Sequence, residues 1–238
     1  MEHIDGITGV IFDYGGTIDS RGEHWSEVIA RAWADAGIAV GREDFRRAYV
    51  HGERTLARER HILPGDNFLD LMRKKMRIEM DLLVGEGILQ ASCIDALVER
   101  TASYCYRQAR ECVDEARPVL DALYGRVPMV LVSNFYGNIE AVLDDFGLRK
   151  YFPDIIESAV VGVRKPDPAI FALGIAALGM EAGHVLVVGD SLRKDILPAR
   201  SLGCRTAWLK GKGWTEEEDR QTDPSQIKSL AEVTEAVF

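Results

Sequence analysis

The sequence predicts an α/β fold: a doubly wound parallel sheet, interrupted by an inserted bundle of four helices. Short apolar runs that end in polar or glycine residues alternate with helical segments over the C-terminal half. Such alternation is typical of a parallel sheet with helical crossovers. The first apolar run is followed instead by helical patterns alone, which predicts a separate bundle. We therefore divide the 238 residues into a core, 1–20 with 114–238, and an inserted helical domain, 21–113.

The expected strands are short apolar runs bounded by turn residues. They lie at 9–13, 128–132, 154–161, 185–188 and 205–209. Helical spacing between and after them, mostly closed by glycine, predicts the core helices. These lie at 119–125, 139–146, 169–178, 195–202 and 225–237.

The inserted domain contains four segments whose apolar residues recur at helical spacing. They lie at 24–36, 42–60, 67–84 and 92–112. Ser92 is the expected N-cap of the last, because a serine hydroxyl accepts from a free N–H of the first turn. Met72, Met76 and Met80 are expected in the core of the bundle.

The composition is that of a globular protein, with 47% hydrophobic and 28% charged residues. A net charge of −9 argues against binding to nucleic acid or to an anionic membrane. We find neither a long apolar run nor a signal-peptide pattern, so we expect a cytoplasmic protein. The four cysteines lack metal-site spacing and are expected to be buried, reduced thiols. No feature predicts an oligomeric state.

Polar side chains stand at strand ends or in the loops that follow. They are Asp13, Ser133 with Asn134, Lys165 and Asp190. In a doubly wound sheet these loops converge on one crevice. A carboxylate can attack phosphorus, and two carboxylates suit Mg²⁺. A hydroxyl and an ammonium can hold phosphoryl oxygens.

The run Asp13-Tyr14-Gly15-Gly16-Thr17, with the other polar groups in this order, resembles the signature of the haloacid dehalogenase (HAD) superfamily. The usual form of that signature is Asp-x-Asp-Gly-Thr. The resemblance covers the whole chain. It implies a Rossmann-like core with a helical cap inserted after the first strand.

The resemblance also implies roles for individual residues. Asp13 would be the nucleophile that forms an aspartyl-phosphate, with Lys165 as its catalytic partner. Mg²⁺ would be held by Asp13, by the main-chain carbonyl of Gly15 and by Asp190. The substrate would be a small phosphorylated molecule.

Further residues match the phosphate-binding and supporting positions of the family. Thr17, Ser133 and Asn134, the last through its N–H, would hydrogen-bond the phosphoryl group. Asp195 would orient Lys165 or a metal-bound water.

Gly15 departs from the family pattern, because the second aspartate of the signature is the general acid and base. Such catalysis contributes about 10²–10⁴-fold. Our main hypothesis is a Mg²⁺-dependent phosphatase of small metabolites with altered acid–base chemistry. Asp19, Glu23 and His24 are the nearest substitutes, and His24 titrates near neutrality. Otherwise His24 is merely a solvated residue that begins the first cap helix.

Two alternatives remain open. Phosphonoacetaldehyde hydrolases of the superfamily have a small residue in place of Gly15, and one of their cap lysines forms a Schiff base. Lys74 and Lys75 are available in the cap, although we expect them on a solvated helix face. The other alternative is a degenerate domain that binds a phosphorylated ligand or a partner. Haloacid dehalogenases have tyrosine at position 15 and no Gly-Asp-Ser motif, so Asp190 argues against dehalogenation.

The end of the second cap helix offers a possible subsite. Arg58, Arg60 and His61 would suit a second anionic group if they face the core. The alternative interpretation is an ordinary exposed helix end.

Overall fold

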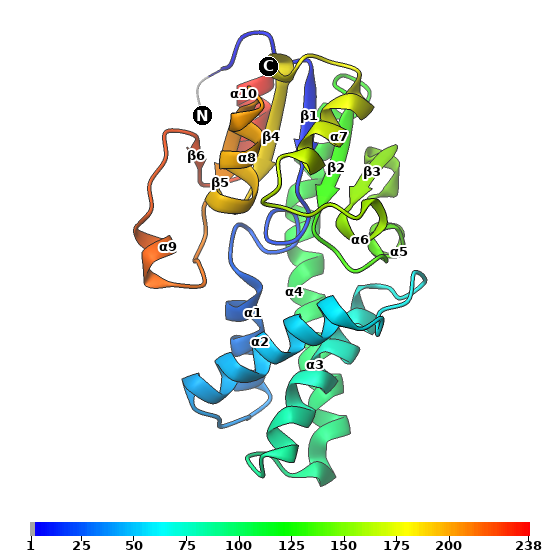
Figure 1. The fold of residues 1–238 in the computed structure, drawn as a ribbon, viewed down its shortest axis with the longest axis vertical. Helices are drawn as coiled ribbons and strands as arrows, with labels where there is room; N and C mark the ends of the chain where they lie inside the picture. Colours follow the sequence, from blue (N-terminus) through cyan, green and yellow to red (C-terminus); the bar gives the residue numbers. More distant parts are fainter. Residues whose placement is uncertain (1–2) are drawn as a thin grey trace.

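A computed structural model describes residues 3–238 and confirms the α/β fold. Figure 1 shows two parts: a sheet flanked by helices, and a group of helices joined to its lower edge. The six strands are all parallel and run in the order β3-β2-β1-β4-β5-β6. Their bounds are β1 Gly9–Phe12, β2 Met129–Ser133, β3 Asp154–Glu157, β4 Val185–Gly189, β5 Arg205–Leu209 and β6 Gln226–Ile227.

The register brings the ends of the central strands to one edge of the sheet. Phe12, the last residue of β1, pairs with Leu131 of β2 on one side and Val188 of β4 on the other. The residues that follow these strands therefore emerge side by side. Asp13 lies at the centre of this edge.

The sheet is covered on both faces, as the alternation of side chains along β1 shows. Val10 and Phe12 belong to one buried cluster, and Ile11 belongs to the other. On the Ile11 face, α7 (Ala169–Leu178) and α8 (Leu197–Ser201) contribute buried residues. On the opposite face the buried residues come from α5 (Ile139–Asp145), α10 (Ala231–Val237) and the end of α4.

Four helices follow β1 before the sheet resumes. Their bounds are α1 Trp25–Asp35, α2 Arg42–Arg58, α3 Phe68–Gly85 and α4 Ile94–Leu123. Figure 1 shows α4 running from this group, which we call the cap, to the back of the sheet. The chain runs through Pro118 as one helix of 30 residues, so the prediction of a separate helix at 119–125 is wrong. The division of the chain at residues 20/21 and 113/114 stays a prediction.

Several other boundaries differ from expectation. Ser92 is not an N-cap, because it lies within the short 3₁₀ segment η1 (Ala91–Cys93). The strand expected at 154–161 is β3 followed by α6 (Ser158–Val161). The expected terminal helix starts only at Ala231, after β6, and α9 (Glu216–Arg220) was not predicted. Three further short elements are η2 Arg149–Tyr151, η3 Ala182–His184 and the π-helical η4 Leu192–Ile196.

The expectation of buried, reduced cysteines is confirmed for three of the four. All four cysteines are free, but Cys93 is exposed, because it lies in the short η1 segment at the start of α4 and not on a buried helix face. Met72, Met76 and Met80 are buried in the cap. Among residues 3–238, no helix combines the length and apolar character that membrane crossing requires.

Candidate active site

Asp13 stands at the carboxyl end of β1 and is almost fully buried. Its Oδ1 lies 2.5 Å from Nζ of Lys165, and its Oδ2 accepts a hydrogen bond of 3.0 Å from Oγ1 of Thr17. Burial raises the pKa of Asp13 overall, although Lys165 opposes that shift. Both oxygens are thus held in fixed directions at the edge of the sheet.

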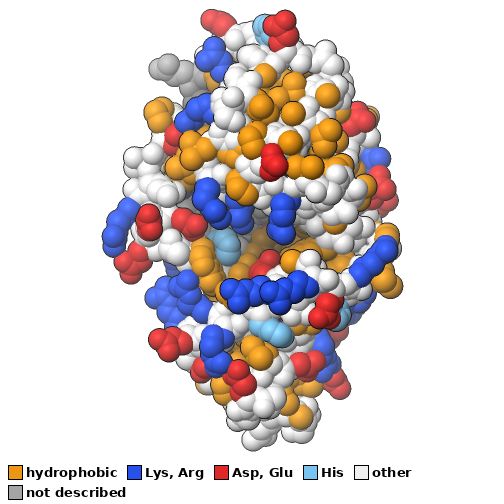
Figure 2. All heavy atoms as spheres, viewed as in Figure 1, with side chains coloured by type: hydrophobic (Ala, Val, Ile, Leu, Met, Phe, Trp, Pro, Cys, Tyr) orange, Lys and Arg blue, Asp and Glu red, His pale blue; other side chains and the backbone are white. Residues whose placement is uncertain are grey.

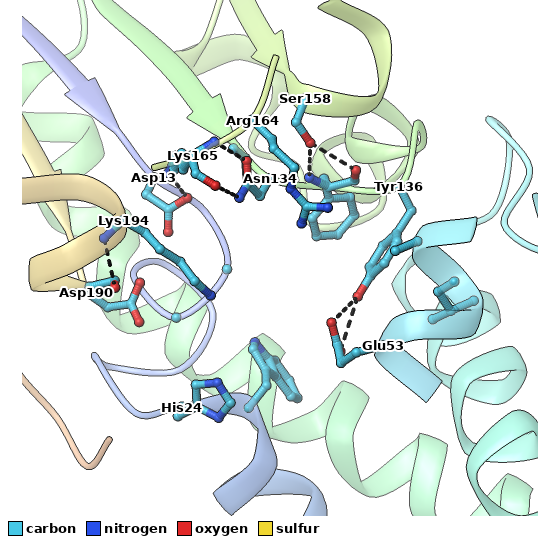
Figure 3. Close-up of a pocket in the computed structure, with 18 of the residues that line it drawn as sticks. Asp13, His24, Glu53, Asn134, Tyr136, Ser158, Arg164, Lys165, Asp190 and Lys194 are labelled. Atoms are coloured by element: carbon cyan, nitrogen blue, oxygen red, sulfur yellow. Dashed lines mark hydrogen bonds and ion pairs between the residues drawn. The ribbon is translucent and has the colours of Figure 1, made fainter. Parts of the chain in front are cut away.

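Lys165 bridges two carboxylates. Its Nζ lies 2.6 Å from Oδ1 of Asp195 as well as 2.5 Å from Asp13. Burial alone would lower the pKa of Lys165, but the two carboxylates raise it, so the ammonium stays charged. The side chain of Asn134 fixes the backbone of this lysine, since Nδ2 donates to the Lys165 carbonyl and Oδ1 accepts from its N–H. Figure 3 shows these two hydrogen bonds between Asn134 and Lys165 beside Asp13.

Three carboxylates face one another at the strand ends. Oxygens of Asp13, Asp190 and Asp195 all lie within 4.8 Å of one another. Burial raises the pKa of Asp190 well above its ordinary value, and Asp195 and Asp13 raise it further. Lys165 and the Ser191 N–H already occupy Asp195. Asp190, by contrast, forms no ion pair with a described residue. Its hard oxygen atoms, together with those of Asp13, which repel them, fit a divalent cation.

Two glycines are required by close packing around these carboxylates. Gly16 has φ +96°, and a Cβ there would lie 2.4 Å from Asp190. A Cβ on Gly189 would lie 2.4 Å from Cβ of Asp195. Gly15 is different, because a Cβ there meets nothing within 4 Å. Packing therefore does not explain the missing second aspartate.

Asp19 and His24, two of the expected substitutes for that aspartate, lie beside the same loop. Oδ1 of Asp19 accepts from the N–H of Gly16 and from Nε1 of Trp25, and its Oδ2 is buried without a partner. Burial raises the pKa of Asp19 to about 7. His24 caps α1 by accepting from the Ser26 N–H, and burial lowers its pKa to about 4. At neutral pH Asp19 is partly protonated, whereas His24 is uncharged.

A cleft of about 1450 Å³ lies between the cap and the carboxyl edge of the sheet. Asp13 and Asp190 line it from the core, and Glu53 of α2 lines it from the cap. The hydroxyl of Tyr136, in the loop after β2, lies 3.4 Å from both carboxylate oxygens of Glu53. Figure 3 shows these two side chains meeting across the cleft. The cap and the core therefore touch through a polar contact in front of the site.

Lys75 is not on a solvated face, which corrects the expectation for this residue. It is 4% exposed, lines the cleft, and pairs with Glu53. Its ammonium also lies 4.6 Å from the centre of the Tyr49 ring. Lys74 is more exposed and pairs with Asp66.

Glu79, one helical turn after Lys75, is fully buried, and neither carboxylate oxygen has a hydrogen-bond partner. Burial raises its pKa to about 8. The folded state therefore holds a proton that the unfolded state releases above about pH 4.5. Stability from this group is complete at low pH and is lost as pH rises toward 8.

We expect Glu79→Gln to abolish that loss. Between pH 5 and 8 the wild type should lose up to about 1.4 kcal/mol of unfolding free energy per pH unit from this group. Urea unfolding at pH 6 and 8 measures the difference, with the exposed Glu217→Gln as control. Parallel pH dependence in wild type and Glu79→Gln would contradict the buried, protonated state.

The structure brings the expected site residues together. Besides Thr17, which bonds Asp13, all of them line the cleft: Asp13, Gly15, His24, Ser133, Asn134, Lys165, Asp190 and Asp195. His61 does not line it and pairs with Glu59 at the surface. Sequence reasoning missed Glu53 and Tyr136. Nothing in their local sequence distinguishes them from ordinary surface residues.

A doubly wound sheet with a buried carboxylate–lysine site under a helical cap defines a class of α/β hydrolases with inserted caps. The family profile of haloacid dehalogenase-like hydrolases matches residues 7–203. The chain belongs to this family and is an enzyme of the hydrolase class.

Similar proteins include a glyceraldehyde 3-phosphate phosphatase of Methanocaldococcus jannaschii, which is 38% identical over 97% of both chains. A haloacid dehalogenase-like hydrolase domain-containing protein 3 of Danio rerio is 43% identical over 34% of each chain, so this chain matches about a third of that relative's length. Among solved structures, the magnesium-bound HAD hydrolase YfnB of Bacillus subtilis has a TM-score of 0.58 at 19% identity, over 95% of this chain and 96% of that one. That likeness concerns the fold.

Proposed function

We propose that this protein is a Mg²⁺-dependent phosphatase of small phosphorylated metabolites that acts through an aspartyl-phosphate at Asp13. The observation that carries the proposal is the fixed Asp13 carboxylate, held by Lys165 and Thr17 beside Asp190 at the floor of a capped cleft. A binding domain has no need of a buried carboxylate in that setting.

In the proposed reaction an oxygen of Asp13 attacks phosphorus, and the bond from phosphorus to the leaving oxygen breaks. Water then attacks the aspartyl-phosphate and releases inorganic phosphate, which regenerates Asp13. Lys165 offsets the negative charge that grows on the phosphoryl oxygens. Mg²⁺, when held by Asp13, Asp190 and the Gly15 carbonyl, would supply further positive charge at those oxygens.

The relatives suggest which phosphate esters to test. The archaeal relative that matches nearly the full chain is named for glyceraldehyde 3-phosphate. We therefore propose three-carbon sugar phosphates as the first natural substrates to assay. The cleft volume of about 1450 Å³ also leaves room for larger esters.

The leaving oxygen needs a proton when it is a poor leaving group. The Asp19 carboxyl, with its pKa raised to about 7, keeps a proton near neutral pH, which His24 does not. We expect Asp19→Asn to slow hydrolysis of an alkyl phosphate about 10²-fold and to spare p-nitrophenyl phosphate, whose leaving group needs little protonation. Alkyl phosphate turnover should also fall above pH 7 in the wild type alone. Equal losses with both substrates would mean that Asp19 only supports the loop through Gly16.

The proposed function is tested by steady-state hydrolysis of p-nitrophenyl phosphate and acetyl phosphate with Mg²⁺ and then with EDTA. Both substrates are activated, so the missing acid matters little. We expect turnover that EDTA removes and that added Mg²⁺ restores. Turnover that persists in EDTA would exclude the metal-dependent reaction, and no turnover with Mg²⁺ would overturn the phosphatase assignment.

One observation favours a second candidate, the phosphonoacetaldehyde-hydrolase-like reaction. Lys75 lies in the cleft wall, where a Schiff-base lysine would be needed. Burial alone lowers the pKa of Lys75, but Glu53 and its neighbours raise it well above the ordinary value, so the amine stays protonated. A Schiff base requires the free amine, which ranks this candidate below the phosphatase. Borohydride trapping with phosphonoacetaldehyde would decide it.

A further inference from the structure

Cationic side chains gather on both sides of the cleft without carboxylate partners. Within the described residues 3–238, six cleft-lining cations have neither an ion pair nor a side-chain hydrogen bond, and a seventh, Lys210, donates only to backbone carbonyls. The six are Arg54, Arg58 and Arg60 from the cap, and Arg164, Arg193 and Lys194 from the core. Figure 2 shows Lys and Arg side chains on both sides of the hollow between the two parts.

This lack of partners is unexpected in so acidic a chain. The protein has 38 acidic and 29 basic residues, so carboxylates are not scarce. Elsewhere arginines find them readily, as in the pairs Arg21–Glu115 and Arg73–Glu99. Seven of the ten Lys and Arg residues that line the cleft form no ion pair, against seven of the nineteen elsewhere in residues 3–238, although the net charge is −9.

Three acidic residues of the cleft wall are directed at other groups of the protein and form no ion pair with these cations. Glu157 accepts from the N–H of Gly137, and Glu218 accepts from the N–H of Trp214. Glu140 pairs with Arg149, which lies outside the cleft lining. The donor groups of the six cations are thus left for a molecule that enters.

Lys194 carries this charge toward the middle of the cleft. Figure 3 shows its side chain extending from the core into the space between Asp190 and His24. After burial, Lys194 is the next cause of the lowered pKa of His24. It also helps Lys75 lower the pKa of Glu53, which burial alone would raise. Its field therefore reaches residues of the cap as well as the core.

We propose that the substrate carries a second anionic group, a carboxylate or a further phosphate, which these cleft cations bind while Asp13 attacks the first phosphate. This inference rests on the proposed phosphatase function and specifies its substrate class. Guanidinium groups bind carboxylates and phosphates through paired hydrogen bonds, which suits the arginines of both sides. Arg54 and Arg58 extend from the same end of α2, so both can contribute from the cap.

Matched substrate pairs test the proposal. Glyceraldehyde 3-phosphate and 3-phosphoglycerate differ only in an aldehyde against a carboxylate. Fructose 6-phosphate and fructose 1,6-bisphosphate form a longer pair. We expect kcat/KM to favour the more anionic member of at least one pair roughly tenfold, and the preference to shrink as salt rises.

Variants then locate the effect. The double substitution Arg54→Gln with Arg58→Gln, and separately Arg164→Gln, should lower the ratio of kcat/KM within the preferred pair, whereas the control Arg107→Gln should not. Arg107 is an exposed arginine of α4 without an ion pair that does not line the cleft. The ratio cancels any general effect on turnover.

The outcomes separate the two proposals. Turnover of p-nitrophenyl phosphate without preference for the anionic member of either pair would overturn the second-anion inference alone. If no phosphate ester is turned over, the phosphatase function fails. Calorimetric binding of the same pairs to wild type then decides whether an anion subsite exists, because equal affinities would refute it.

Discussion

Replacing Asp13 by Asn is expected to reduce turnover of activated phosphate esters by roughly 10⁴-fold or more. The amide keeps the shape of the carboxylate but cannot attack phosphorus. Lys165, which lies 2.5 Å from Oδ1 of Asp13, would remain in place through its pairing with Asp195. The loss should therefore appear in kcat, and the acid-stable phosphoenzyme that we expect after rapid quench of the wild type should be absent.

Loss of folding must not be mistaken for this result. Asp13, Asp190 and Asp195 repel one another within 4.8 Å, so removing one charge should leave the thermal midpoint unchanged or higher. Asp154→Asn, at the exposed start of β3, serves as the matched control and should retain activity. Full turnover in Asp13→Asn would exclude the aspartyl-phosphate route.

The strand ends of the active site could be predicted from sequence because their signal is local. Each apolar run is followed at once by its polar residue, as in Phe12-Asp13 and Gly189-Asp190. The parallel register of the strands then places these polar residues side by side. The orientation of a polar side chain is harder to predict. The side chain of Asn134 clamps the backbone of Lys165, a contact that spans 31 residues and has no local signature.

The sequence did not lead us to predict the burial of Lys75, although this residue fits the helical spacing of the buried residues of α3. Lys75 and Glu79 continue the buried spacing of α3 that runs through Leu71, Met76 and Leu83. Because Lys75 and Glu79 are charged, the sequence alone favoured their exposure to solvent. Only the packing of α2 against α3 supplies Glu53 as a partner for the lysine, and that tertiary contact cannot be derived from residue periodicity.

The extent of α4 was also underestimated. Its buried residues keep helical spacing from Ala109 through Ala116 to Leu123, so the cap and the core share one continuous helix. Thirty residues span about 45 Å at 1.5 Å per residue. A rigid element of that length links the position of the cap to that of the sheet.

Gly15→Asp should raise hydrolysis of a simple aryl phosphate up to about 10²-fold. The added carboxylate would take a proton from the water that attacks the aspartyl-phosphate, a step that every substrate shares. Gly15 is absent from the positive-φ glycines, and a Cβ at this position meets nothing within 4 Å, so the side chain can enter without strain. Steady-state assays of p-nitrophenyl phosphate with Mg²⁺ measure the gain.

Gly15→Asn is the matched control, because it has the same shape and cannot exchange a proton. A gain with Asp and not with Asn would establish that the natural glycine costs the enzyme its acid–base group. The gain should persist in the Asp19→Asn background if the new carboxylate works independently of Asp19. An unchanged rate in Gly15→Asp would mean that proton transfer does not limit this enzyme, and the natural substrate would then be one with a good leaving group.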